Sequence, residues 1–341
     1  MSKKVQTDMF HTDSAVSMNG VTKIFTQWQR ETKNVFKNLL RPEKRIITAL
    51  DNVSFEIGKG EFVAYAGPNG AGKSTTMKLL SGMLLPTSGE ISVLSMSAQK
   101  QRRALMNQMG VLFGNRTELW WDHPVIQSFE WKKVVWDIPE KTYQENLERV
   151  TALLGIGSLL KTFARELSLG QRMRADLAMM LLHSPGLILL DEPTLGLDVV
   201  AKRQMIEFLK QINREEKVTI IVTSHDMDDL EEMAERILMI SDGKMAYDGN
   251  FDGLRKATGN LTRVIVSTEG GARPTLGNAK LLSAENGVYE FEIDLAQTPI
   301  KALMRVLSDS DGVCDVEIKK APIEQVIAKL YESWQTRDGS V

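Results

Sequence analysis

The sequence has a single cysteine, no long hydrophobic run and almost no net charge. Cys314 alone cannot form an internal disulfide or a multi-cysteine metal site, and a lone cysteine suits a reducing compartment. No apolar stretch approaches the roughly 18 to 20 residues of a membrane-spanning helix, and the polar start of the chain is unlike a signal peptide. With 42 Lys and Arg against 44 Asp and Glu, the chain lacks a general basic field, so we expect no nucleic acid partner.

What is present is typical of a globular protein. The 341 residues, of which 43% are hydrophobic and 25% charged, suffice for two domains. From Ala49 to Gly249, short apolar strands alternate with amphipathic helices, a pattern that indicates a parallel sheet covered by helices. We therefore predict an α/β domain over residues 1–258 and a smaller accessory or regulatory domain over residues 259–341.

The smaller domain is predicted to be α+β. Residues 288–294 alternate apolar and acidic side chains, as a strand with one buried face does. Apolar stripes at helical spacing follow at 300–307 and 323–331, with a strand near Cys314 between them. This order favours a ferredoxin-like sandwich.

The segment Gly67–Thr75, GPNGAGKST, matches the phosphate-binding loop pattern. It lies between an apolar strand at 62–66 and a helical pattern, so its backbone N–H groups and the helix dipole favour phosphate. Glycine allows the close approach of the backbone to the anion. In such a loop Lys73 reaches the β and γ phosphates and Ser74 ligates magnesium. The alternative is a glycine-rich turn without a ligand.

An apolar strand, Leu187–Leu190, ends in two adjacent carboxylates. Asp191 would hold the magnesium shell through water, and Glu192 could polarise the attacking water as a general base. Alone, these acids are ordinary strand-to-turn punctuation. The strand with its two acids is the Walker B arrangement. Together with the phosphate loop it predicts a nucleotide-hydrolysing site.

The sequence LSLGQ at Leu167–Gln171 opens a helical pattern and resembles the signature motif of ABC ATPases. Gly196-Leu197-Asp198 resembles the D-loop of that family, and His225, which follows an apolar strand, resembles its switch histidine. These motifs occur in family order, and the resemblance covers about residues 15–258. It implies a P-loop NTPase domain of ABC type with a helical subdomain. It also implies a dimer, in which the signature serine and glycine bind the γ-phosphate of a nucleotide held by the second subunit.

A narrower resemblance rests on GVLFGNRTELWWDHP, LSLGQRMRADLA and DEPTLGLDVVAK. These segments look like the ATP-binding subunits of bacterial exporters of drugs, viologen-type compounds or polysaccharides, whose permeases are separate six-helix proteins. The resemblance thus implies ATP hydrolysis with Mg²⁺ and a location on the cytoplasmic face of the inner membrane, held there by the permease. The residues it assigns to nucleotide or metal are Phe25, Gly67, Pro68, Asn69, Gly70, Ala71, Gly72, Lys73, Ser74, Thr75, Asn115, Ser168, Gly170, Gln171, Asp191 and Asp198, with Glu192, His225 and Lys73 in catalysis.

Two positions depart from the family. Where a Q-loop glutamine contacts magnesium, this sequence has Gly114-Asn115, so Asn115 would take that place with an amide one methylene shorter. The aromatic residue that stacks on adenine would be Phe25, with Trp28 as the rival.

Two further regions allow two interpretations each. Residues 26–47 contain six basic and two acidic side chains, with apolar residues near helical spacing. We interpret them as a basic insertion that is either a solvated surface or an amphipathic helix near the permease or lipid. Four tryptophans at 120, 121, 131 and 136, with Phe129, are either core or an interface with the permease.

Other functions are less consistent with the sequence. Soluble ABC proteins that act on ribosomes usually carry two cassettes, and those that act in repair carry a long coiled coil, whereas this chain has one phosphate loop and one signature. A P-loop kinase would leave the signature unexplained. The sequence therefore favours the interpretation that the protein is the ATPase subunit of an exporter.

Overall fold

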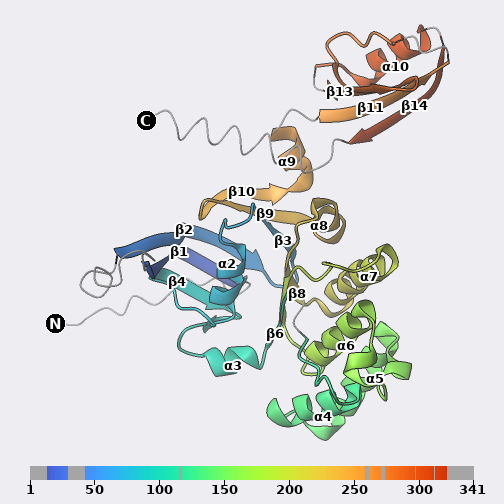
Figure 1. Ribbon diagram of the computed structural model, residues 1–341. Helices are drawn as coiled ribbons and strands as arrows, with labels where there is room; N and C mark the ends of the chain where they lie inside the picture. The colour runs from blue at the N-terminus through green and yellow to red at the C-terminus, as the bar shows by residue number, and fades with distance from the viewer. Residues whose placement is uncertain are drawn as a thin grey trace. The chain divides into compact units, whose positions relative to one another are not determined.

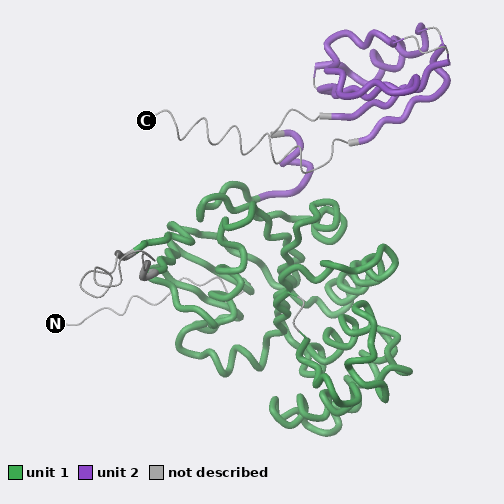
Figure 2. Tube along the Cα trace, viewed as in Figure 1, with its two compact units in different colours: residues 1–248 green, residues 249–341 purple. Residues whose placement is uncertain are grey.

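The computed structural model describes residues 14–29, 43–114, 117–257, 261–269, 273–295, 297–310 and 312–320. The chain forms two compact units, Met1–Asp248 and Gly249–Val341 (Figure 2). The first unit therefore ends before the predicted boundary after residue 258, and α9 (Phe251–Ala257) belongs to the second unit.

A six-stranded sheet lies at the centre of the first unit, in the order β10-β9-β3-β8-β7-β6 (Figure 1). The pairs from β9 through β3, β8 and β7 to β6 are parallel. Every residue of β3 and β8 is buried, as expected for strands covered on both faces. The bounds are β3 Phe62–Ala66, β6 Met109–Phe113, β7 Leu187–Asp191, β8 Thr219–Thr223, β9 Arg236–Ser241 and β10 Lys244–Asn250.

A second sheet, with the order β2-β1-β4-β5, is antiparallel. Figure 1 shows α2 between this sheet and the parallel one. Side chains from both sheets and from α2, including Val16, Tyr65 and Leu79, share one buried cluster. The bounds are β1 Ser14–Gln29, β2 Glu43–Gly58, α2 Lys73–Leu80, β4 Ser88–Val93 and β5 Met96–Ser97.

Where the structure describes residues 26–47 they form strands, so the helical alternative is wrong for Thr26–Gln29 and for 43–47. Thr26–Gln29 continue β1 and 43–47 begin β2, in the antiparallel register Thr26 to Ile46 and Gln29 to Glu43. Cross-strand hydrogen bonds thus extend a hairpin, and Trp28 lies on a strand instead of a helix. Val35, Phe36, Leu39 and Leu40 lie outside the described residues.

Helices form the rest of the first unit. Figure 1 shows α4, α5 and α6 gathered in one region, which matches the helical subdomain implied by the resemblance. Met173, Leu177 and Leu181 of α6 are buried, as the spacing predicts. The bounds are α3 Arg102–Met106, α4 Val125–Val135, α5 Glu140–Leu154, α6 Leu169–Leu181, α7 Val199–Glu216 and α8 Met227–Met233.

The second unit contains an antiparallel sheet, β12-β13-β11-β14, packed on α10. The predicted alternation of β13 is confirmed, since Phe291 and Ile293 are buried in the cluster that holds Leu303 of α10. A full β-α-β-β-α-β order also needs a helix between β11 and β12. None occurs there among the described residues, and Pro274 and Gly277 disfavour one. The bounds are β11 Leu261–Thr268, β12 Lys280–Glu285, β13 Val288–Asp294, α10 Ile300–Ser308 and β14 Val313–Lys320.

Across the ranges that the structure describes, every helix is too short or too polar to traverse a lipid bilayer.

Candidate active site

The phosphate loop joins β3 to α2 as predicted, and close packing explains two of its glycines. Gly72, directly before α2, has φ 114°, and a Cβ there would lie 2.7 Å from the Ala49 carbonyl oxygen. A Cβ on Gly67 would lie 2.3 Å from the Ile240 carbonyl oxygen. Backbone therefore touches backbone at both positions, and only glycine fits. Of the other loop residues, Pro68, Asn69, Gly70 and Ser74 are exposed, Thr75 is half-buried and Ala71 is buried.

Lys73, the first residue of α2, is folded back into the loop. Its side chain is only 7% exposed, and Nζ donates hydrogen bonds to the carbonyl oxygens of Gly67 at 2.6 Å and Pro68 at 3.1 Å. Burial lowers the pKa of the Lys73 ammonium, while the negative charges of Glu192 and Asp191 act in the opposite direction. A cation is thus held against the backbone that would surround a phosphate.

A chain of hydrogen bonds joins the start of α2 to the ends of the neighbouring strands β7 and β8. The Ser74 hydroxyl donates to Asp191 Oδ2 at 3.1 Å, and the Thr223 hydroxyl donates to Asp191 Oδ1 at 2.6 Å. The backbone N–H of Glu192 donates to Oγ1 of Thr223 at 3.1 Å. Both carboxylate oxygens of Asp191 are therefore oriented by hydroxyls from α2 and β8.

Glu192 stands where β7 ends, in a backbone conformation that side chains rarely adopt. Its φ is 59°, in the left-handed region. Its backbone N–H also donates to the Thr223 carbonyl oxygen at 3.1 Å, and its Oε1 lies 2.6 Å from Nε2 of His225. Strained backbone of this kind persists where surrounding contacts hold it and is enriched at active sites.

The end of β6 meets the same edge of the sheet. Phe113 is in register with Asp191, and the Gly114 N–H donates to the Asp191 carbonyl oxygen at 3.0 Å. Asn115 follows directly but lies outside the described residues. The structure thus places only the chain that leads to Asn115, and its role as a metal ligand stays a prediction.

The signature residues line a different surface. Ser168 caps α6 by accepting from the Gln171 N–H at 3.3 Å, and the Gln171 side chain accepts from the Ser168 N–H at 2.9 Å, which completes a capping box. Asp198 caps α7 in the same way, by accepting from Ala201 N–H at 2.8 Å. Ser168, Gly170, Gln171 and Asp198 line one shallow groove between these two helix starts. We call it the signature groove.

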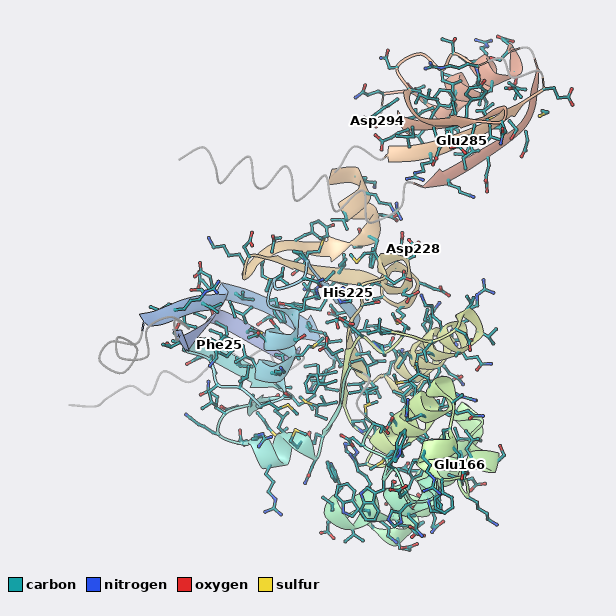
Figure 3. The ribbon with its side chains drawn as sticks, viewed as in Figure 1. Phe25, Glu166, His225, Asp228, Glu285 and Asp294 are labelled. Carbon is teal, nitrogen blue, oxygen red and sulfur yellow. The ribbon has the colours of Figure 1, made fainter. Side chains whose placement is uncertain are left out.

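The structure therefore brings the predicted residues together in two sets. Lys73, Ser74, Asp191, Glu192 and His225 meet at the edge of the parallel sheet, which we call the catalytic edge. Figure 3 shows Glu166, two residues before the signature serine, well apart from His225. Phe25 lies on the antiparallel sheet with the Lys23 ammonium 5.0 Å from its ring centroid, and its place in nucleotide binding stays a prediction.

The aromatic residues after β6 are divided between core and surface. Phe129 is fully buried, whereas Trp120, Trp121 and Trp131 are 39%, 49% and 37% exposed. The rings of Trp120 and Trp131 lie 5.7 Å apart, and Trp131 and Trp136 lie 6.4 Å apart. Exposed aromatic side chains are favoured anchors at protein–protein interfaces. We call Trp120, Trp121 and Trp131 the tryptophan surface.

Two residues that organise this region, Thr223 and Asp176, belong to no sequence motif. Thr223 reads as one more β-branched residue in an apolar strand, although its hydroxyl orients Asp191. Asp176 reads as an interruption in the apolar pattern of α6, between Ala175 and Leu177. The position of Asp176 could have been noticed from the sequence, because a carboxylate among buried neighbours needs hydrogen-bond partners.

Comparisons with known proteins identify the family. The family described as ABC transporter matches residues 50–195. An uncharacterized ABC transporter ATP-binding protein of Bacillus subtilis, YhcH, is 31% identical over 277 residues, which are 81% of this chain and 87% of that protein. The chain belongs to the ABC transporter ATP-binding proteins.

Two further relatives extend the comparison. The probable multidrug ABC transporter ATP-binding protein YbhF of Escherichia coli is 37% identical over 220 residues, which are 62% of this chain and 36% of YbhF. The ATP-binding cassette MJ0796, solved as a dimer with ADP and Pi after hydrolysis, superposes with a TM-score of 0.58 at 24% identity, covering 69% of this chain and 98% of that one. The likeness to MJ0796 supports the ABC ATPase fold, and membership of the family makes this chain an ATPase subunit of an ABC transporter.

Proposed function

We propose that two copies of this chain bind two ATP molecules head to tail between them and that hydrolysis drives export through a separate membrane permease. The observation that carries the proposal is the division of the family's motifs between the catalytic edge and the signature groove. Each surface is built within one chain, yet one chain does not bring them together. A dimer that places the catalytic edge of one copy against the groove of its partner gives each nucleotide both sets of contacts.

The catalytic edge suits magnesium as well as phosphate. Mg²⁺ prefers oxygen ligands and is commonly held by one or two protein side chains together with substrate phosphates. The Ser74 hydroxyl and the Asp191 carboxylate, 3.1 Å apart, are such a pair. Bound there, the ion would neutralise charge on the phosphates, and Asn115 is the expected third contact.

The roles of the other residues follow from their positions. The Lys73 ammonium, at the start of α2, is placed to bind the β and γ phosphates. Glu192 can accept a proton from the attacking water, and His225, 2.6 Å from the Glu192 carboxylate, holds that group in place. From the partner, the helix N-terminus at Ser168 and Gly170, with Gln171 and Asp198 beside it, would contact the γ-phosphate.

The tryptophan surface is the proposed contact with the permease. It directly follows the chain that leaves the catalytic edge at Gly114, so a permease bound there would lie next to the nucleotide-dependent region. Export is favoured because YbhF, a probable multidrug ABC transporter ATP-binding protein, is 37% identical over the matched region. The chain would then work at the cytoplasmic face of the inner membrane.

Glu192→Gln tests the proposed function. The amide keeps the shape of the side chain but cannot take a proton from water, so we expect the ATPase rate to fall about 10²- to 10⁴-fold while ATP binding persists. Gel filtration in ATP and Mg²⁺ should then give the mass of a dimer. Glu145→Gln, an exposed glutamate on α5, is the matched control and should keep the wild-type rate. A fully active Glu192→Gln chain, or one that stays a monomer with ATP bound, would contradict the proposal.

A further inference from the structure

Helix α6 carries a buried carboxylate that the proposed function does not use. Asp176 is 6% exposed and lies two turns beyond the signature serine. Its Oδ1 accepts from the Thr117 hydroxyl at 2.9 Å and from the Glu118 N–H at 3.0 Å. The Thr117 hydroxyl in turn accepts from the Leu119 N–H at 3.1 Å. Segment 117–119 is therefore attached to α6 by two hydrogen bonds to one side chain, and a third bond within the segment orients the Thr117 hydroxyl.

A carboxylate is an expensive means of packing a helix. Burial raises the pKa of Asp176 to about 6, with the negative charge of Glu118 adding to that effect and the two hydrogen bonds opposing it. An apolar residue at the same site would avoid the desolvation cost, as the neighbouring Ala175 and Leu177 do. What the carboxylate supplies instead is a directional attachment of segment 117–119 to α6.

Segment 117–119 lies between the catalytic edge and the tryptophan surface. It begins three residues after Gly114, whose N–H is bonded to the Asp191 carbonyl oxygen. The next residue is Trp120, whose N–H donates to the Ser128 hydroxyl of α4 at 2.9 Å. A shift of this segment therefore displaces Trp120 directly.

The side chain of Glu118 provides a second connection to the same tryptophans. Its Oε2 lies 3.4 Å from the ammonium of Lys132, a buried residue of α4. That ammonium is 3.6 Å from the ring centroid of Trp136, which contacts Trp131. Burial lowers the pKa of Lys132, and the charge of Glu118 opposes this effect. Asp176 accepts from the backbone of Glu118 and thus positions the residue whose carboxylate pairs with Lys132, the cation over the ring of Trp136.

We propose that Asp176 is a positioning residue that makes segment 117–119 move with α6. Engagement of the signature groove by the partner's nucleotide would then displace the contacting rings of Trp120, Trp131 and Trp136. This inference rests on the proposed function, because α6 moves only if a nucleotide held by the second copy reaches Ser168. We expect this unit to move as one body because its hydrogen bonds are directional and converge on the buried carboxylate of Asp176. A contact of Arg172 with the ring of Trp121, at 5.3 Å, is a separate attachment of α6 to the tryptophan surface.

Tryptophan fluorescence tests the proposal directly. The reference is the full chain with Glu192→Gln, which holds ATP, and with Trp28→Phe, Trp121→Phe and Trp334→Phe. These substitutions leave Trp120, Trp131 and Trp136 as the only reporters. ATP with Mg²⁺ should change their emission, and Asp176→Ala should reduce the change at least about threefold. Asp176→Asn should retain it, because an amide oxygen still accepts both hydrogen bonds.

Parallel measurements separate the outcomes. Binding of labelled ATP and the gel-filtration mass should be the same in the reference and in Asp176→Ala. Asp229→Ala, which removes another buried aspartate of the first unit, should leave the emission change intact. If Asp176→Ala does not fold, Thr117→Val replaces it and should reduce the change, because it removes the hydroxyl that donates to Asp176 and accepts from the Leu119 N–H.

Several results would overturn the inference. These are a full emission change in Asp176→Ala or Thr117→Val, a loss of the change in Asp176→Asn, and no change in a reference chain that binds ATP and dimerises. In all three the proposed function survives. A reference chain that does not bind ATP or does not dimerise would contradict the proposed function itself and, with it, this inference.

Discussion

The catalytic edge and the signature groove differ in how their side chains are held. At the catalytic edge, bonds run between distant parts of the chain, from Ser74 of α2 to Asp191 of β7 and on to Thr223 of β8. In the groove, the capping bonds of Ser168 and Asp198 reach only three residues along their own helices.

This difference indicates how each surface meets its ligand. A network that crosses three elements is pre-organised by the fold and can meet a ligand without rearranging. A helix start with local caps still carries further backbone N–H groups directed outward, and it gains partners for them only when an anion arrives. The catalytic edge therefore determines how ATP is held within a chain, and the groove determines whether a second chain joins it.

The largest expected effect comes from removing the cation of the catalytic edge. Lys73→Ala deletes a charged partner of the phosphates, and such bonds are worth about 1.5–3 kcal/mol, so the dissociation constant of ATP should rise roughly 10- to 100-fold and hydrolysis should fall to background. Equilibrium binding and ATPase assays measure both. Lys78→Ala, on the exposed side of the same helix, is the control and should bind ATP normally. Unchanged affinity in Lys73→Ala would mean that the ammonium stays on the loop carbonyls.

A mixing experiment examines whether the two surfaces belong to one site across two chains. Ser168→Arg fills the groove with a bulky cation, and Lys73→Ala disables the catalytic edge, so each variant alone should be inactive. In a one-to-one mixture, half of the dimers join an intact edge to an intact groove at one of two sites, and we expect activity to return to about a quarter of wild type. No recovery in a mixture shown to contain heterodimers would indicate that each chain uses its own groove.

The catalytic edge could be predicted from sequence because its motifs stand at the carboxyl ends of parallel strands. Such ends share one edge of the sheet, so Lys73, Asp191 and His225 converge once each strand is recognised. The motifs of the groove could also be predicted from the sequence, because Ser168 and Asp198 stand at the beginnings of helices. Periodicity could not reveal the hairpin at Thr26–Gln29, because strand pairing with 43–46 depends on a partner far along the chain.

The residues that sequence reasoning missed are those that act through others. Thr223 has the composition of a strand residue, and only its position beside Asp191 in the sheet shows that its hydroxyl is an orienting donor. The ferredoxin-like sandwich was inferred for the second unit from the order of its later elements, and that fold implies a helix between β11 and β12. Local residues such as Pro274 and Gly277 counted against it.

A smaller effect should follow from loosening the catalytic edge without removing any proposed ligand. Thr223→Val keeps the shape of the residue but deletes the bond to Asp191 and the acceptor for Glu192 N–H, and loss of such orienting bonds commonly costs 10- to 100-fold in activity. We expect kcat to fall about tenfold, with the KM for ATP little changed. Thr219→Val, a buried threonine at the other end of β8, should lower stability without this loss of kcat. Equal kcat values for the two variants would show that Asp191 does not need the Thr223 hydroxyl for catalysis.

The smallest expected effect is a pH-dependent change in the free energy of unfolding, caused by the titration of Asp176 on α6. The folded-state pKa of Asp176 lies at about 6 against an ordinary 3.8, so the folded chain binds the proton more tightly than the unfolded one. The stability contributed by protonated Asp176 is therefore present at low pH and is lost as the pH rises through about 6. Arg172 opposes the shift, and Glu118 adds to it.

Asp176→Asn removes this titration while keeping an acceptor for Thr117 and Glu118. We expect the variant to unfold at higher urea concentration than wild type at pH 8, by about 1–2 kcal/mol, and the gap to narrow as the pH falls toward 5. Asp228→Asn, an aspartate of α8, is the control for a change in net charge and should show no such narrowing. If Asp176→Asn is the less stable chain at pH 8, the carboxylate gains more from its bonds than it loses by burial. The attachment of segment 117–119 to α6 would then depend on the charge of Asp176, whereas the capping box of Ser168 and Gln171 on the same helix uses only neutral donors and acceptors.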